Sequence, residues 1–287
     1  MTCAILRIMP QDGLRSAIRR LVPREIRNWL RSPRKTATWI WHSAQFKFGF
    51  NEEFKLPTGE ILACHPTVYR TAVKAQVEDP EQSAEFSQFI SYCRPGMSLF
   101  DIGASFGMFS LACAKLGGTA VALDPSHIAT AMVKKQLRLN NLEASVKVME
   151  CAVGDTEGSI EMVSSGIFSD GYLKYESGRE RRELRRVPLT TVDRLCEKLG
   201  YPSHLKIDVE GFEAAVIRGS RELLEHHAPL IFLELHNEMV KEMGGDIAFC
   251  VNALTSLNYK IFSVEGSPLS VDEALRPSIC RILAKRA

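Results

Sequence analysis

The chain has 287 residues, of which 45% are hydrophobic, 24% charged and 8% aromatic; this composition is typical of globular proteins and excludes collagen-like, low-complexity and wholly disordered chains. No run of about 18 apolar residues that could span a bilayer occurs, and the N-terminus lacks the long apolar core of a secretory signal. The net charge of +2 is unevenly distributed, because residues 1–47 hold ten of the 36 Lys/Arg and only two of the 34 Asp/Glu residues.

The basic N-terminal arm, residues 1–50, includes a broken amphipathic helix expected over residues 14–35 and interrupted at Pro23. Two interpretations stay open. The arm either lies on an anionic membrane surface, or it is a solvated or packed extension. No nucleic-acid partner is expected, because the rest of the chain is acidic and carries no nucleic-acid-binding motif.

The cysteines are scattered and form no CxxC pair, which predicts free thiols in a reducing compartment. We therefore expect a cytoplasmic protein, with peripheral contact at the inner membrane face if the arm binds lipid.

Residues 51–96 predict a short α+β extension: a hairpin in which EFKL and ILAC flank the turn PTGE, then a helix over residues 81–93. From residue 97 onward, short apolar strands alternate with amphipathic helices. This alternation predicts one α/β domain over residues 97–287, with a doubly wound, mainly parallel sheet. Polar turns and short strand-like pieces near residues 159–189 predict a β insertion.

The segment DIGASFG, from Asp101 to Gly107, follows a predicted strand and opens a helix. Gly103 would let a ligand approach the backbone, and Gly107 would let the helix pack closely. The glycine spacing differs from the G-x-G-x-x-G of dinucleotide-binding proteins. Asp101 would repel a phosphate but attract a cationic amino group, so pyrophosphate binding is disfavoured.

Acidic residues and a histidine close the later strands. Asp124 lies 21 residues after Gly103 at the end of the next strand, a position suited to binding ribose hydroxyl groups. Asp208 follows LKI, and Glu234 and His236 share one face at the end of LELH. Each also has a purely structural interpretation, as a residue near a helix start or a structural histidine.

Taken together, these motifs resemble the FkbM family of S-adenosylmethionine-dependent methyltransferases. The resemblance covers about residues 90–240 and is carried by the following segments, in order: PGMSLFDIGASFGMFS, ALDPS, CAVGDTEG, VPLTTVDRL, LKIDVEGFEAAVIRGS and PLIFLELH. Ser105 departs from the pattern, since relatives commonly have Asn there.

The resemblance implies a class I methyltransferase fold, which is Rossmann-like, and O-methylation of a sugar, glycan, glycan-lipid or natural-product hydroxyl. Residues implied to bind S-adenosylmethionine are Asp101, Gly103, Ala104, Gly107, Asp124, Glu150 and Cys151. We expect His236 to act as general base, with Asp208 and Glu234 as orienting or alternative groups. Two carboxylates on neighbouring strand ends could also hold Mg²⁺.

Two other functions remain open. A nicotinamide-dependent oxidoreductase is disfavoured by the missing dinucleotide glycines. A degenerate methyltransferase-fold binding module is disfavoured by the joint presence of Asp101, Gly103, Asp124 and Asp208.

Overall fold

The structure, a computed structural model, describes residues 51–164, 183–242 and 244–286. The basic arm and the middle piece of the expected β insertion, GYLKYE, lie outside the described residues. Within those residues, no helix combines the length and the apolar character needed to cross a membrane.

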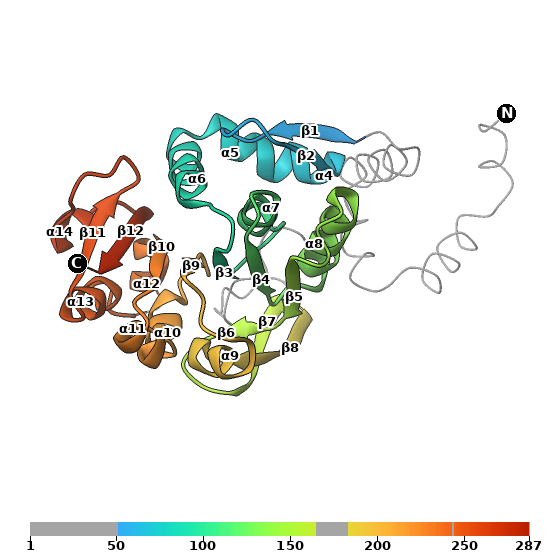
Figure 1. The fold of residues 1–287 in the computed structure, drawn as a ribbon. Helices are drawn as coiled ribbons and strands as arrows, with labels where there is room; N and C mark the ends of the chain where they lie inside the picture. Colours follow the sequence, from blue (N-terminus) through green and yellow to red (C-terminus); the bar gives the residue numbers. More distant parts are fainter. Residues whose placement is uncertain (1–50, 165–182, 243, 287) are drawn as a thin grey trace, which may run out of the picture. The chain divides into compact units, whose positions relative to one another are not determined.

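A seven-stranded sheet in the order β11-β12-β10-β9-β3-β4-β5 forms the centre of the fold (Figure 1). All neighbouring strands in the run from β10 to β5 are parallel, whereas β12 is antiparallel to both β10 and β11. The predicted doubly wound, mainly parallel sheet is therefore confirmed. Its strands are β3 (Ser98–Ile102), β4 (Thr119–Asp124), β5 (Val146–Glu150), β9 (His204–Ile207), β10 (Leu230–Leu235), β11 (Tyr259–Ser263) and β12 (Cys280–Arg286).

The strand order reverses between β3 and β9. From β3 the chain runs through α7 (Met108–Lys115) to β4 and through α8 (His127–Asn140) to β5, and later strands are added on the other side of β3. In doubly wound sheets, ligands bind in the crevice beyond the carboxyl ends of the strands at such a reversal. The topology therefore predicts a ligand site at the carboxyl ends of β3 and β9.

Each face of the sheet buries its own apolar layer, because successive residues of a strand point to opposite sides. On β3, Leu99 joins the cluster that includes residues of α6 (Pro80–Tyr92), α7 and α8, whereas Phe100 joins the cluster on the opposite face. Figure 1 shows the two helical layers on either side of the sheet. The second layer comprises α9 (Val192–Leu199), α10 (Glu213–Arg218), α11 (Arg221–His226), α13 (Phe249–Ser256) and α14 (Val271–Leu275). Helix α12 (Asn237–Glu242) follows β10.

The segment before the sheet packs into the first apolar layer. Its hairpin pairs β1 (Glu52–Lys55) with β2 (Ile61–Cys64), and Phe86 and Phe89 of α6 belong to the same cluster. Helix α6 begins after Asp79, whose carboxylate accepts hydrogen bonds from the N–H groups of Glu81 and Gln82. Between hairpin and α6 lie α4 (Pro66–Val68), the π-helix η2 (Tyr69–Val73) and α5 (Lys74–Glu78).

The expected β insertion is present as a separate three-stranded sheet in the order β6-β8-β7, made of β6 (Ala152–Val153), β7 (Gly158–Ser164) and β8 (Glu183–Thr190). Strands β7 and β8 are antiparallel, and β8 is parallel to β6, which follows β5 in the chain. The insertion is thereby attached next to the carboxyl end of β5.

Two local features differ from what the sequence favours. The segment FEAAVIRGSRELLEHH, residues 212–227, has the pattern of a single helix, but it is divided into α10 and α11 at Gly219, where a Cβ would be 2.0 Å from the Gly154 carbonyl oxygen. Thr190 and Asp193 are spaced like a capping box, but they do not form one. Thr191 caps α9 instead, and the Asp193 carboxylate accepts the N–H groups of Glu222 and Leu223 at the start of α11.

A buried histidine makes the stability of this fold depend on pH. His204, the first residue of β9, is 3% exposed, and burial together with the charge of Arg94 lowers its pKa to about 4. An unfolded histidine has a pKa near 6.5. The folded state therefore favours the neutral ring of His204. Its contribution to the free energy of unfolding is complete above about pH 6.5 and is lost as the pH falls towards 4.

We expect the free energy of unfolding to fall by about 3 kcal/mol between pH 7 and pH 4 through His204 alone. Denaturant titrations of the wild type and of His204→Asn at both pH values measure this quantity. Over the same pH interval, the free energy of unfolding of the variant should fall by about 3 kcal/mol less than that of the wild type. An identical loss in both proteins would show that His204 is not the group responsible.

Candidate active site

A pocket of about 230 Å³ lies at the reversal point of the sheet. One wall is the loop that joins β3 to α7, and the others come from β9 and from the segment before the sheet. The lining residues are Thr71, Ala72, Gln76, Gln82, Asp101, Gly103, Ala104, Ser105, Phe106, Met108, Phe109, Lys206 and Asp208. The structure therefore brings Asp101, Gly103, Ala104 and Asp208, four of the predicted site residues, to one cavity.

The glycine turn after β3 is fixed by a close approach to β9. Gly103 has a φ of +81°, and a Cβ there would lie 1.7 Å from the Asp208 carbonyl oxygen. The Asp208 N–H also donates to the Ile102 carbonyl at 3.0 Å. We predicted that Gly103 leaves room for a ligand. The structure shows that it first leaves room for the backbone that carries Asp208.

Gly107 behaves as predicted for close packing, since a Cβ there would lie 3.0 Å from both methyl carbons of Val133 on α8. Between the two glycines, Ser105 has a φ of +48°. Asn tolerates this left-handed conformation better than most side chains do, which explains why Asn suits this position in relatives.

The Asp124 carboxylate connects the glycine turn to the end of β4. Its Oδ2 accepts the Ser105 N–H and its Oδ1 accepts the Ser126 N–H, each at 2.8 Å. Asp124 is 8% exposed and does not line the described pocket. The carboxylate therefore fixes the glycine turn relative to the start of α8.

The Asp101 side chain faces the pocket from the end of β3. Its Oδ2 accepts hydrogen bonds from the backbone N–H and the hydroxyl of Ser110, at 3.0 and 2.6 Å. Burial raises the pKa of Asp101 to about 6, although the hydrogen bonds from Ser110 and the charge of Lys206 oppose the shift. The carboxyl group is therefore held by α7 and stays mostly ionised at neutral pH.

Glu150, the last residue of β5, and Cys151, which follows it, lie outside the described pocket. Glu150 pairs with Asp124 in the register of β4 and β5, which places the two side by side at the sheet edge. Its carboxylate contacts His127 at 2.8 Å and forms a close ion pair with Arg185 of β8. Cys151 is buried, and burial raises the pKa of its thiol to about 11, so it is a neutral group.

A buried charge network lies at the carboxyl ends of β9 and β10. The Lys206 ammonium, 2% exposed, is 2.8 Å from Glu85 of α6, 3.8 Å from Glu234 and 4.0 Å from Asp208. It also lies 5.0 Å from the centre of the Phe109 ring. The charges of these carboxylates outweigh burial and raise the pKa of Lys206, so it remains an ammonium ion.

Glu234 is held from the opposite side by β12. Arg281, which pairs with Glu234 in the β10–β12 register, donates a hydrogen bond to Glu234 Oε1 at 2.8 Å. Burial and the nearby charge of Asp208 raise the pKa of Glu234 to about 7.

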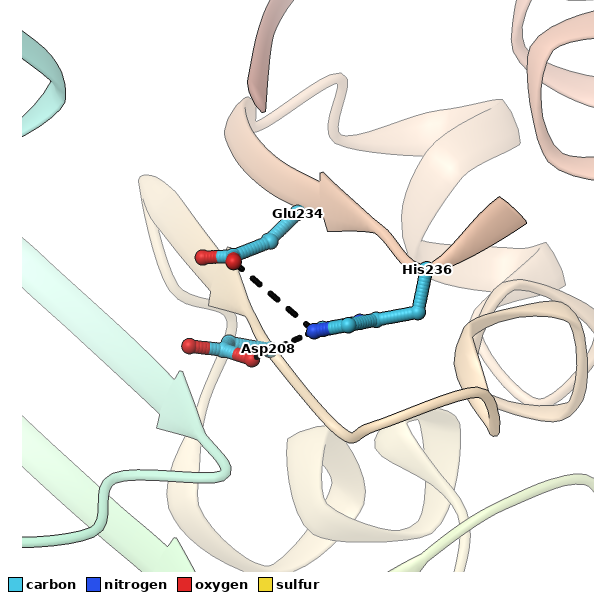
Figure 2. A group of neighbouring side chains, drawn as sticks. All are labelled: Asp208, Glu234 and His236. Carbon is cyan, nitrogen blue, oxygen red and sulfur yellow. Dashed lines mark ion pairs between the residues drawn. The ribbon is translucent and has the colours of Figure 1, made fainter. Parts of the chain in front are cut away.

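Figure 2 shows Asp208, Glu234 and His236 directed towards one another. His236 is 4% exposed, and its Nε2 lies 3.8 Å from Asp208 Oδ1 and 3.7 Å from Glu234 Oε1. Its Nδ1 is 2.7 Å from Glu213 Oε1. Burial works to lower the pKa of His236, but the hydrogen bond to Glu213 and the surrounding carboxylates outweigh it and raise the pKa to about 9.

Several residues of the site were not singled out from the sequence. Thr71, Gln76, Gln82 and Glu85 come from the segment before the sheet, and Arg281 comes from β12. None of them belongs to a motif. The only signal was the chemical improbability of a lysine inside an apolar strand, LKI, which requires buried acidic partners.

The parallel strands, the strand reversal at β3 and β9, the glycine turn after β3 and the antiparallel β12 between β10 and β11 together define a class I methyltransferase fold. A family model described as the methyltransferase FkbM domain matches residues 101–261, more than half of the chain. The protein belongs to this family, as the sequence motifs indicated.

Two curated relatives are ribosomal protein L11 methyltransferases. The protein from Lachnoclostridium phytofermentans is 33% identical over 88 residues, which cover 30% of this chain and 26% of the relative. The protein from Desulfitobacterium hafniense is 28% identical over 81 residues, covering 28% and 26%. The similarity therefore spans about a quarter of the length of these relatives.

Solved structures with a similar arrangement include the methyltransferase FkbM from Methylobacillus flagellatus, with a TM-score of 0.45, 14% identity and coverage of 76% of this chain and 60% of that chain. Another is the precorrin-6y C5,15-methyltransferase from Geobacter metallireducens, with a TM-score of 0.42, 12% identity and coverage of 72% and 90%.

The contact between Gly103 and Asp208 can be tested with a matched pair of glycines. Gly103→Ala should lower the free energy of unfolding by about 2–5 kcal/mol, because left-handed strain and a backbone clash add together. Gly59 also has a positive φ, +105°, but no atom lies within 4 Å of the place that a Cβ would take there. Gly59→Ala should therefore cost only the strain, about 1–2 kcal/mol. Equal losses in denaturant titrations of the two variants would rule out a special role for the contact.

Proposed function

We propose that the protein is an S-adenosylmethionine-dependent methyltransferase that methylates a hydroxyl group of a sugar, glycan or natural product. One observation carries this proposal: the glycine-turn pocket of a methyltransferase fold opens directly beside a buried cluster of carboxylates and a histidine. The first part suits the cofactor, and the second suits the binding and deprotonation of an acceptor hydroxyl.

The residues present fit the cofactor. Asp101 offers a carboxylate to a cationic amino group, and the turn from Gly103 to Ser105 offers backbone at the pocket wall. Asp124 places a carboxylate beside the glycine turn at the end of β4, the position suited to ribose hydroxyls. Glu150 and Cys151 follow at the end of β5, where adenine would lie next to the Glu150–Arg185 ion pair.

When bound, S-adenosylmethionine supplies a methyl group that is activated by its attachment to a sulfonium sulfur and that can be transferred to the acceptor oxygen. The chain itself has to align the acceptor oxygen and remove the hydroxyl proton. We keep Asp208, Glu234 and His236 as the catalytic group, but we move the role of general base, which we expected for His236, to Asp208. Asp208 lines the pocket and is 34% exposed, so its carboxylate is placed to take the proton. His236, with a pKa of about 9, is protonated at neutral pH and orients this carboxylate.

The cofactor assignment can be tested by titration. Wild type should bind S-adenosylhomocysteine and not NAD, which separates the proposal from a nicotinamide-dependent oxidoreductase. Asp124→Ala should weaken S-adenosylhomocysteine binding at least about tenfold, because hydrogen bonds to a charged group contribute about 1.5–3 kcal/mol.

Asp193→Ala is the matched control for Asp124→Ala. Asp193 also accepts two backbone N–H groups, but at the start of α11. If loss of a structural carboxylate explained the effect, both variants would weaken binding. We expect Asp193→Ala to bind S-adenosylhomocysteine like the wild type. Unchanged affinity in a folded Asp124→Ala protein would leave Asp124 with only its structural role.

The catalytic group can be tested by transfer of a labelled methyl group from S-adenosylmethionine to acceptors in a fractionated lysate. Asp208→Asn and His236→Ala should each reduce the transfer rate by about 10²–10⁴-fold, the usual contribution of a positioned acid–base group. Their affinity for S-adenosylhomocysteine should stay near that of the wild type. Asp155→Asn, which alters only an exposed ion pair with Arg218, is the control.

Wild-type transfer rates in both variants across pH 6–9 would remove Asp208 and His236 from the mechanism. Binding of S-adenosylhomocysteine by a wild type that labels no acceptor would favour a degenerate binding module.

A further inference from the structure

We propose that Asp208, Glu234 and His236 form a binding site for a first-row divalent metal ion at the end of the pocket. The proposal rests on the positions of the three side chains and on the charges around them. The catalytic use of the ion rests on the proposed methyl transfer, but its binding does not.

The first line of support is the geometry of the ligand atoms. One atom from each of the three residues lies within 4.8 Å of the other two, and His236 Nε2 is 3.8 Å from Asp208 Oδ1 and 3.7 Å from Glu234 Oε1. A tetrahedral Zn²⁺ about 2.0–2.2 Å from its ligands holds them about 3.3–3.6 Å apart. The two distances from His236 Nε2 would have to shorten by a few tenths of an ångström to match this spacing, and Figure 2 shows the three side chains directed towards one another.

The second line of support is the orientation of the histidine. Metal-binding histidines usually donate their other ring N–H to a carboxylate, which fixes the tautomer and directs the free nitrogen at the ion. His236 Nδ1 lies 2.7 Å from Glu213 Oε1, and Glu213 is 1% exposed and also held by the Gly211 N–H. Among the described residues, Nε2 makes no hydrogen bond, and it is directed at Asp208, Glu234 and Glu210.

The third line of support is charge. Five carboxylates surround the site, and the permanent cations that face them are Lys206 and Arg281. The carboxylates are Glu85, Asp208, Glu210, Glu213 and Glu234. With the carboxylates ionised and His236 protonated, the formal charge is negative by two. Buried excess charge needs a counter-ion, and a divalent cation that displaced the His236 proton would leave the charge negative by one.

The donor set indicates the class of metal. Mg²⁺ prefers oxygen ligands alone, whereas an imidazole nitrogen beside two carboxylates suits Zn²⁺, Mn²⁺ or Fe²⁺ better. Three protein ligands leave at least one open position, as in catalytic rather than structural sites. Asp208 lines the pocket, so an acceptor hydroxyl could occupy that position.

Such an ion would make the hydroxyl more acidic. With the ion bound, the hydroxyl proton would pass to Oδ2 of Asp208, the oxygen that lies 4.0 Å from the Lys206 ammonium. The acceptor oxygen would then form its bond to the methyl carbon while the electron pair of the broken carbon–sulfur bond returned to the sulfur.

The test uses the full chain, stripped of metal with a chelator, and equilibrium dialysis against Zn²⁺ alone. Wild type should retain one equivalent. Asp208→Asn and His236→Gln should each weaken binding at least tenfold. Asp208→Asn is the more secure variant for folding, because its side chain is 34% exposed. The double variant His226→Gln/His227→Gln removes two histidines outside the site that could bind Zn²⁺ nonspecifically, and it should bind like the wild type.

Absence of stoichiometric Zn²⁺ in the wild type, or equal binding by a folded Asp208→Asn protein, would overturn the site. Titration of the metal-free protein with S-adenosylhomocysteine separates this result from the proposed function. Zn²⁺ binding without S-adenosylhomocysteine binding would support the metal site and overturn the methyltransferase proposal. The reverse result would overturn the metal site alone.

Discussion

A single buried ammonium group organises the site. Lys206 lies on a strand whose flanking side chains, Leu205 and Ile207, are apolar, and at 2% exposure it cannot be solvated by water. Burying a charge is costly unless it is paired, so its neighbours must be acidic. They come from three elements: Glu85 from α6, Glu234 from β10 and Asp208 from the end of β9. The lysine thereby attaches the segment before the sheet to the strand ends that carry Asp208 and Glu234.

The glycine turn after β3 also depends on the position of Asp208. Position 103 requires glycine because the Asp208 carbonyl occupies the space that a Cβ would take. The turn is also stabilised by Asp124, whose carboxylate accepts a hydrogen bond from the Ser105 N–H. The pocket beside the glycine turn and the acidic cluster are therefore linked by the backbone contacts of Gly103 and Ile102 with Asp208. A change on either strand end would displace both, so the two motifs depend on each other for their geometry.

The segment before the sheet is part of the site and not only a leader to it. Thr71, Gln76 and Gln82 line the pocket, and Glu85 neutralises Lys206. The π-helix from Tyr69 to Val73 lies within this segment, and π-helical turns are frequent near functional sites. In this arrangement the sheet positions the glycine turn and the acidic cluster, and the segment before the sheet forms one side of the pocket.

The sequence by itself determined the class of fold, because alternating strands and helices and the turn DIGASFG follow from local periodicity and glycine placement. It also determined that Asp208, Glu234 and His236 lie at strand ends, since residues alternate along a strand. Only the tertiary structure decided that α6 and β12 supply Glu85 and Arg281, that Asp193 caps α11, and that Glu213 orients His236. These contacts join residues distant in the chain, and no local pattern records which distant partner a buried charge finds.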